Sequence, residues 1–187
     1  MRRNRRTVAA SIFLNTQAVL NAISSDQDID VLSEAGIEAC KKGTTKRIPP
    51  VAAAVWEVLQ IHEVDLHNKK IVILGKGKLV GMPLMQLFER EQISYCAFDL
   101  QSKTDDMLQS IKDSDIVITG FGKPYFLKPD MVKDGVILID CGTSESEGKL
   151  TGDIDPTCAS KASLFTPVPG GIGPITVACL YRNLFLE

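Results

Sequence analysis

A glycine-rich segment that could bind a dinucleotide follows the first strongly apolar run of the chain. The run covers residues 71–74 and ends at Gly75, and Gly77 and Gly81 follow before a helix-like segment over residues 83–90. Gly75 allows a tight turn, and Gly77 has no side chain to obstruct a pyrophosphate. A helix N-terminus supplies free N–H groups and a partial positive charge. The segment predicts dinucleotide binding; because its Gly-x-Gly-x-x-x-Gly spacing is one residue longer than the usual fingerprint, an ordinary glycine-rich turn is the alternative.

Charged residues near this segment bear on which nicotinamide cofactor would bind. Asp99 lies 24 positions after Gly75, close to the ~20 expected for a carboxylate that binds the ribose 2′-hydroxyl of NAD. Lys76 and Lys78 instead favour the 2′-phosphate of NADP. Like charges repel each other at close range, so an Asp99 turned toward the ribose would oppose a 2′-phosphate. The sequence alone leaves both cofactors open.

A second unusual segment, over residues 166–178, is rich in proline and glycine. Pro167 and Pro169 stiffen the chain, and the three glycines that follow permit close backbone approach or a positive φ. Pro174 suits the first turn of the helix expected next. A stiff loop with few side chains could line a flat ligand, and a simple turn between domains is the alternative.

Short apolar runs alternate with helical segments from residue 65 onward. Several of these runs are apolar at every position, which is typical of strands covered on both faces in a parallel sheet. The alternation predicts an α/β fold with a doubly wound, Rossmann-like parallel sheet. The expected strands lie at residues 71–74, 93–98, 115–120, 136–140 and 163–166, and the expected helices at 83–90 and 105–111.

The chain has a different character before and after this alternation. Residues 16–23 and 51–62 have the spacing of helices, whereas residues 24–47 between them are polar and broken by glycines. Residues 175–186 form another helical segment with an apolar stripe. We expect this last helix to return to the first segment.

Composition limits the class of protein. The 187 residues are 44% hydrophobic and 24% charged, which excludes wholesale disorder and fibrous repeats. The net charge of −2 disfavours a duplex-binding module, and no apolar run approaches the ~18 residues that span a bilayer. Five widely spaced cysteines indicate free thiols in a reducing compartment, with Cys96 and Cys141 expected in the core. His62 and His67 lack the spacing of a helical zinc pair, so no metal site is expected.

The N-terminus has an unusual charge distribution. Four arginines occur within residues 1–6, no acidic residue precedes Asp26, and an apolar stretch follows at residues 8–14. This order outlines a signal peptide, and an arginine-rich organellar presequence is a second alternative. The absence of an Ala-x-Ala cleavage site favours a basic tail before a short strand or helix.

Several segments together resemble the motifs of one family. Residues 75–83 resemble a Gly-Arg-Ser-x-Ile-Val-Gly-x-Pro loop, and residues 28–30 are similar to an Asp-Val-Asp-Gly motif. The proline–glycine segment resembles the signature of the same family. Further similarity covers residues 102–104, 120–124, 136–142 and 152–155. These motifs resemble the bifunctional methylenetetrahydrofolate dehydrogenase/methenyltetrahydrofolate cyclohydrolase family.

The resemblance implies a cytoplasmic, homodimeric, multifunctional enzyme of one-carbon metabolism. Such enzymes oxidise 5,10-methylenetetrahydrofolate with NAD(P)⁺ and hydrolyse the methenyl product to 10-formyltetrahydrofolate, acting as oxidoreductase and hydrolase. It implies NADP as cofactor, with NAD as the alternative, a tetrahydrofolate derivative as substrate, and neither a nucleic acid nor a membrane as partner. The cofactor-binding residues that it implies are Gly75, Lys76, Gly77, Ser102 and Thr143. The substrate-binding residues are Asp30, Pro169, Gly170, Gly171, Ile172 and Gly173.

The sequence also departs from the family pattern. The family's catalytic lysine lies in an N-terminal folate domain, most of which has no counterpart here, so no catalytic residue is assigned. Lys76 replaces arginine, which loses bidentate phosphate geometry, and Gly77 replaces serine. We expect a truncated folate-domain remnant at residues 1–64, a dinucleotide-binding domain at 65–172 and the returning helix at 173–187. The alternatives are a non-catalytic dinucleotide-binding or dimerising remnant and an oxidoreductase that resembles amino-acid dehydrogenases.

Overall fold

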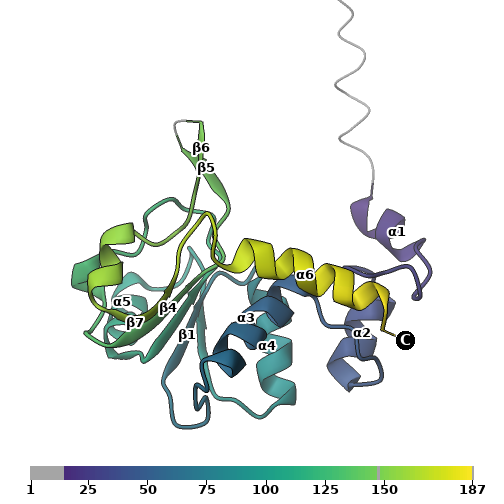
Figure 1. Cartoon of the computed structure of the whole chain (residues 1–187), viewed down its shortest axis with the longest axis horizontal. Coiled ribbons are helices and arrows are strands. Elements are labelled where there is room, and N and C mark those ends of the chain that lie inside the picture. Colours follow the sequence, from purple (N-terminus) through teal and green to yellow (C-terminus); the bar gives the residue numbers. More distant parts are fainter. Residues whose placement is uncertain (1–14, 147, 187) are drawn as a thin grey trace, which may run out of the picture.

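A parallel sheet with helices on both faces forms the larger part of the computed structural model, which describes residues 15–146 and 148–186 (Figure 1). The basic tail and the apolar stretch at residues 8–14 lie outside the described residues. The strands are β1 (Ile71–Leu74), β2 (Cys96–Phe98), β3 (Ile116–Thr119), β4 (Val136–Asp140) and β7 (Ala162–Thr166). Their order is β2-β1-β3-β4-β7, and every neighbouring pair is parallel. The predicted α/β, doubly wound fold is confirmed.

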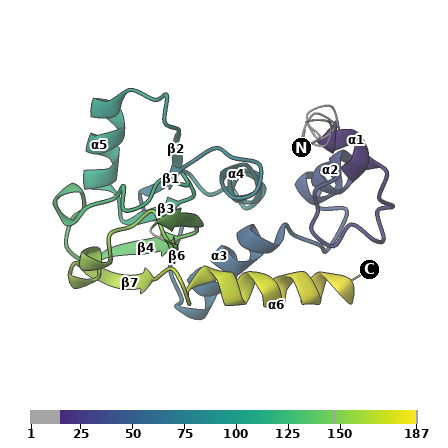
Figure 2. The same cartoon turned by 90° about the horizontal axis from the view of Figure 1, so that it is seen from above.

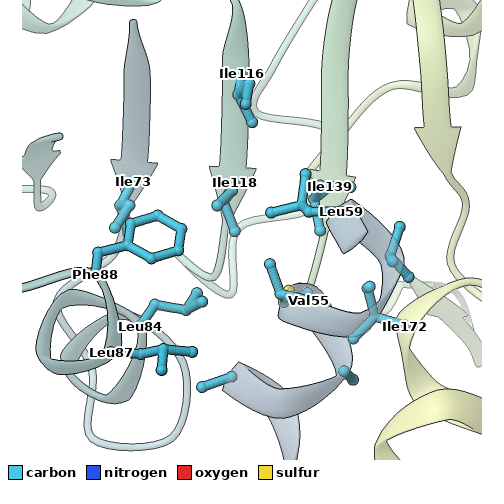
Figure 3. Close-up of a cluster of buried hydrophobic side chains, with 14 of the residues drawn as sticks. Val55, Leu59, Ile73, Leu84, Leu87, Phe88, Ile116, Ile118, Ile139 and Ile172 are labelled. Carbon is cyan, nitrogen blue, oxygen red and sulfur yellow. The ribbon is translucent and has the colours of Figure 1, made fainter. Parts of the chain in front are cut away.

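The sheet separates two hydrophobic cores because successive strand side chains point to opposite faces. Ile73, Ile118 and Ile139 lie in the core that is covered by the helices α3 (Pro50–Ile61), α4 (Gly81–Arg90) and α6 (Ile172–Leu184) (Figure 3). Their sequence neighbours Val72 and Val117 lie in the other core, under α5 (Thr104–Asp113). Two short 3₁₀ helices, Pro129–Met131 and Pro156–Ser160, lie in the connections that follow β3 and β6. Burial on both faces explains why these strands are apolar throughout.

Among the described residues before α3, the chain forms two helices, α1 (Thr16–Asn21) and α2 (Glu34–Lys42), of which only the first was expected. The Ser33 side chain caps α2 by accepting from the Gly36 amide (3.0 Å), and Gly43 ends the helix with φ +67°. Only Cys40 of α2 is buried, so the helix lacks the apolar stripe that a periodicity argument needs. Its start and stop signals, Ser33 and Gly43, were the features that could have revealed it.

Two further features of the sheet region differ from expectation. The hairpin of β5 (Ser144–Ser146) and β6 (Lys149–Thr151) was not predicted, because its strands are short and polar. Cys96, expected in the core, is exposed, whereas Cys141 is buried as expected. The prediction for Cys96 is wrong because β2 is an edge strand, so its apolar neighbours do not imply burial on both sides.

The last helix, α6, returns along α3 to the first segment (Figures 1 and 2). Near its end, the Asn183 side-chain amide donates to the carbonyls of Ile29 and Ile48 (2.8 Å each). Arg47 Nε donates in turn to the carbonyls of Asn183 (3.1 Å) and Leu186 (3.0 Å). These bonds fix the helix C-terminus, where unpaired carbonyls need donors. No helix in the described part of the chain has the length and apolar character of a membrane span.

Candidate dinucleotide-binding site

The carboxyl ends of β1 and β3 mark the point at which the chain reverses its direction across the sheet. From β1 the chain moves outward to β2 and then returns to the other side of β1 as β3. Ligands of open parallel sheets bind at such a switch point. Leu74 is paired in register with Thr119, so the loops after β1 and β3 start level with each other. They also touch, because the Gly120 amide donates to the Leu74 carbonyl (2.7 Å) and a Cβ on Gly75 would overlap the Gly120 carbonyl oxygen.

The need for glycine differs among the three glycine positions of the loop after β1. Gly75 has φ +109°, and its amide donates to the Phe98 carbonyl at the end of β2 (2.8 Å). Gly81 begins α4 so close to Gly75 that a Cβ would collide with the Gly75 carbonyl oxygen. Gly77 is exposed, lacks a positive φ, and would place a Cβ with no atom within 4 Å. The protein's own packing does not require glycine at position 77, whereas a ligand lying against this backbone would.

The backbone of this loop can receive an anion. Among the hydrogen bonds of the described residues, none uses the amides of residues 76–81 as donors. These N–H groups lead into the N-terminus of α4, a helix of 10 residues, where the helix dipole favours negative charge. Lys76 and Lys78 are exposed in the same loop. The donors and charges present therefore fit a pyrophosphate.

Asp99 faces Lys76 at the end of β2. Its carboxylate lies 3.9 Å from the Lys76 ammonium, accepts from the Gln101 amide (2.9 Å) and accepts from the Ser102 hydroxyl (3.0 Å). The Ser102 hydroxyl holds the pKa of Asp99 below its usual range, and the Gln101 amide and the Lys76 charge act in the same direction. The carboxylate is therefore ionised at neutral pH, and Lys76 partly neutralises it.

The predicted cofactor residue Thr143 lies on the other side of the switch point. It is exposed in the loop after β4. Its neighbour Ser144 has its hydroxyl 4.0 Å from a Cβ built on Gly122, in the loop after β3. The structure therefore brings Lys76 and Ser102 together at one side, and places Thr143 beside the loop that forms the other side.

The predicted substrate loop lies between β7 and α6. Gly170 is exposed with φ +99°, and a Cβ on Gly171 would lie 2.5 Å from the Pro167 carbonyl oxygen. Pro169 and Gly173 are exposed, as residues that line a ligand should be. The Ile172 side chain instead lies in the core with α3, which leaves only its backbone to line a ligand.

Asp30 lies at the opposite end of α6 from this loop. Its neighbour Ile29 is bonded to Asn183, eleven residues after Ile172, which corresponds to roughly 16 Å along a helix axis. Desolvation raises the pKa of Asp30, and the charge of Asp28 adds to this effect. The structure does not bring Asp30 and the proline–glycine loop together, so only an extended ligand could touch both.

A pocket of about 380 Å³ is lined by residues between positions 25 and 47, and none of its lining residues belongs to the glycine loop. Asp28, Val31 and Arg47 are among its lining residues. The Asp28 carboxylate already accepts from the Ser33 hydroxyl (2.6 Å) and the Leu32 amide (3.0 Å). The pocket therefore lies near Asp30 in the sequence. Its buried carboxylate, Asp28, stabilises the local backbone through these hydrogen bonds.

A doubly wound parallel sheet with an anion-receptive glycine loop at its switch point defines a Rossmann-like dinucleotide-binding domain. A family model described as the tetrahydrofolate dehydrogenase/cyclohydrolase NAD(P)-binding domain matches residues 49–187. The chain belongs to this family, and the resemblance seen in its motifs is confirmed.

Similar proteins agree with this assignment. The bifunctional protein FolD of Clostridium perfringens is 35% identical over 177 residues, which cover 93% of this chain and 62% of that protein. A solved 5,10-methylenetetrahydrofolate dehydrogenase from the silkworm, Bombyx mori, matches with a TM-score of 0.85 and 31% identity, over 92% of this chain and 62% of that one. A Trypanosoma brucei dehydrogenase-cyclohydrolase solved with NADP and an inhibitor matches with a TM-score of 0.84 and 29% identity, covering 92% and 61%. This chain thus spans about three fifths of the length of these relatives.

Proposed function

We propose that this chain binds NADP along the glycine loop and takes part in oxidising 5,10-methylenetetrahydrofolate and hydrolysing the methenyl product. The observation that carries the proposal is the open backbone at Gly77, with unused amides at residues 76–81 leading into α4. Family membership supports a nicotinamide dinucleotide. The Trypanosoma relative solved with NADP, together with Lys76 and Lys78, supports the phosphorylated form.

Each cofactor residue has a task in this proposal. Gly75 and Gly77 let the backbone approach the pyrophosphate, and Lys76 supplies positive charge beside the adenosine ribose. Ser102 orients Asp99 at the end of β2 through two hydrogen bonds. Thr143 lies on the side where the nicotinamide end would lie. The nicotinamide supplies the ring carbon that accepts a hydride, while the protein supplies its position.

The remaining assignments are part of the same proposal. Asp30 and the loop at residues 169–173 would contact an extended tetrahydrofolate derivative, with the first 64 residues and α6 on the folate side and residues 65–172 on the dinucleotide side. Five free thiols support a cytoplasmic location. Val177 and Tyr181 are more than half exposed on α6 and support contact between two copies in a homodimer.

The second candidate function is dinucleotide binding without turnover. It is favoured by the separation of Asp30 from the proline–glycine loop along α6. It is also favoured by the lack of a catalytic residue among the matched motifs. Under this function the protein would bind the cofactor but not a folate.

Turnover of 5,10-methylenetetrahydrofolate separates the two functions. The purified 187-residue chain is incubated with this substrate and either NADP⁺ or NAD⁺, and reduced nicotinamide is followed by absorbance. If the chain is catalytic, reduction of the cofactor is expected and depends on the folate. Cofactor binding without any reduction, at micromolar enzyme, would leave the non-catalytic function.

Cofactor selectivity should depend on the Lys76–Asp99 pair. Asp99→Asn removes a negative charge beside the ribose and should raise the affinity for NADPH relative to NADH roughly tenfold, while Lys76→Ala should lower that ratio. Calorimetric titration with both cofactors measures the ratio. Asp105→Asn, in the exposed first turn of α5, is the control that should leave it unchanged. An unchanged ratio in Asp99→Asn would show that the carboxylate does not face the 2′-position.

A further inference from the structure

Two aspartates with no part in the proposed cofactor contacts are buried beside the switch point. Asp140 ends β4 and is 1% exposed, and Asp153 follows β6 and is 0% exposed. No lysine or arginine of the described residues forms an ion pair with either carboxylate. A buried charge without a counter-charge is costly unless hydrogen bonds satisfy it. The hydrogen bonds that these two carboxylates accept therefore indicate their structural role.

The Asp153 carboxylate binds three consecutive amides of the loop after β3. One oxygen accepts from the amides of Phe121 (2.7 Å) and Gly122 (3.2 Å), and the other accepts from the Lys123 amide (2.7 Å). Gly122 has φ +68°, which lets successive amides turn toward one point. Successive amides that converge in this way form a nest of the kind that binds phosphate in many proteins. Here the protein's own carboxylate fills the nest.

Asp140 fixes the backbone that carries Asp153. It accepts from the Thr119 hydroxyl (3.0 Å) and from the amides of Gly142 (2.9 Å), Asp153 (3.1 Å) and Ile154 (2.9 Å). The Asp140 amide donates to the hydroxyl of Thr166 on β7 (2.9 Å). The position of Asp153 is thereby tied to three strands of the sheet.

Two glycines make room for these carboxylates. A Cβ on Gly142 would lie 2.5 Å from Asp153 Cγ, and a Cβ on Gly152 would collide with the Asp140 carboxylate. Burial raises the pKa of Asp140, and burial together with the Asp140 charge raises the pKa of Asp153, while the amides oppose both shifts. The glycines of both sequence motifs thus serve the carboxylates.

We propose that Asp153 is a positioning residue for the bound dinucleotide, which it serves by holding the loop at residues 120–124 as one wall of the binding crevice. The inference rests on the proposed function and adds a residue to it. The loop lies opposite the glycine loop, as the Gly120–Leu74 hydrogen bond and the close contact of Gly120 with Gly75 show. Because Asp153 occupies the donors of the nest, the phosphates are left to the amides of residues 76–81. The loop contributes its shape, which three bonds to Asp153 set.

Asp153→Asn tests this inference through the dissociation constant of NADPH, measured by nicotinamide fluorescence. The new side-chain NH₂ would face amide donors, so the loop should shift, and the Kd should rise roughly tenfold or more, the change expected from losing one hydrogen bond to a charged acceptor. Asp155→Asn is the matched control two residues further on. The Asp155 carboxylate binds Lys128 (2.8 Å) and Thr157 rather than this loop, so the Kd should not change.

Two further variants separate positioning from stability. Ile111→Ala, in the core under α5, should lower the free energy of unfolding and leave the Kd unchanged. Gly122→Ala strains the turn from the loop side, because φ at this position is +68°. The strain would come from the backbone alone, since the nearest atom to the new Cβ is the Ser144 hydroxyl at 4.0 Å. The Kd of Gly122→Ala should rise as well, and this variant replaces Asp153→Asn in the test if Asp153→Asn does not fold.

The outcomes distinguish this inference from the function on which it rests. Wild-type protein that binds neither NADPH nor NADH refutes the proposed function, and the inference with it. Wild-type binding with an unchanged Kd in folded Asp153→Asn, or in Gly122→Ala if that is the variant available, overturns the inference alone. An equal rise of the Kd in Ile111→Ala would also overturn it, because the effect would then be one of stability.

Discussion

Replacement of Gly81 by alanine is expected to lower the free energy of unfolding by about 3 kcal/mol or more. The new Cβ would collide with the Gly75 carbonyl oxygen and lie 2.7 Å from the Gly75 carbonyl carbon and 3.0 Å from Lys76 Cα. All three are backbone atoms, so α4 or the end of β1 has to move, and closely packed interiors resist such movement. The better helix propensity of alanine offsets only about 1 kcal/mol of this cost.

Urea unfolding followed by circular dichroism measures this effect. Gly77→Ala is the matched control in the same loop, because its Cβ would meet no atom within 4 Å and its φ is not positive. Its stability should stay within about 0.5 kcal/mol of the wild type. Equal midpoints for Gly81→Ala and Gly77→Ala would contradict the close packing of α4 on the loop.

Replacement of Gly77 by aspartate should preserve the fold and weaken dinucleotide binding by roughly 100-fold or more, about 2.7 kcal/mol. The open space around Gly77 accommodates the side chain. The new carboxylate would lie beside the amides of residues 76–81, where the proposed pyrophosphate carries negative charge. Repulsion between the two anions, together with the bulk of the side chain, gives the expected loss.

Calorimetric titration with NADPH measures this loss, and Gly77→Asn separates charge from size. Asparagine has the same shape as aspartate without its charge, so it should weaken binding less. Gly77→Asp protein that is folded and retains wild-type affinity would place the phosphates elsewhere.

The sheet could be predicted from the sequence because its strands are buried on both faces. Residues 71–74 and 136–140 were predicted with the bounds that the structure shows, since continuous apolar runs end sharply at glycine or a charged residue. The second strand was predicted too long, at residues 93–98 instead of Cys96–Phe98. Ile93 is buried, but it belongs to the irregular connection before the strand rather than to the strand.

The glycine loop could also be located from the sequence, whereas the surroundings of its residues could not. The motif placed Gly75 and Gly77 after a strand and before a helix, as observed. The direction of Asp99 depends on the Ser102 hydroxyl three residues later and on Lys76, which belongs to the loop after a different strand. The contact with Ser102 is local, whereas the contact with Lys76 is set by the tertiary structure and cannot be inferred from sequence spacing.

The role of Asp153 is the clearest example of what sequence reasoning missed. The segment 152–155 was recognised as a motif, but nothing in it points to amides about 30 positions earlier in the chain. The glycines at 142 and 152 were the available signal, because each sits against a buried carboxylate. The need for glycine at these positions becomes apparent only in the tertiary structure, where residue 142 lies against Asp153 and residue 152 against Asp140.

Amide chemical shifts recorded during an NADPH titration test most directly whether the phosphates rest against the glycine loop. A ¹⁵N-labelled sample of the 187-residue chain gives one signal for each backbone amide other than those of proline. The largest shifts are expected on residues 76–81, with smaller shifts at residues 121–123. Saturating NADPH that leaves residues 76–81 unshifted, or that shifts only residues around the Asp28 pocket, would contradict this placement of the phosphates.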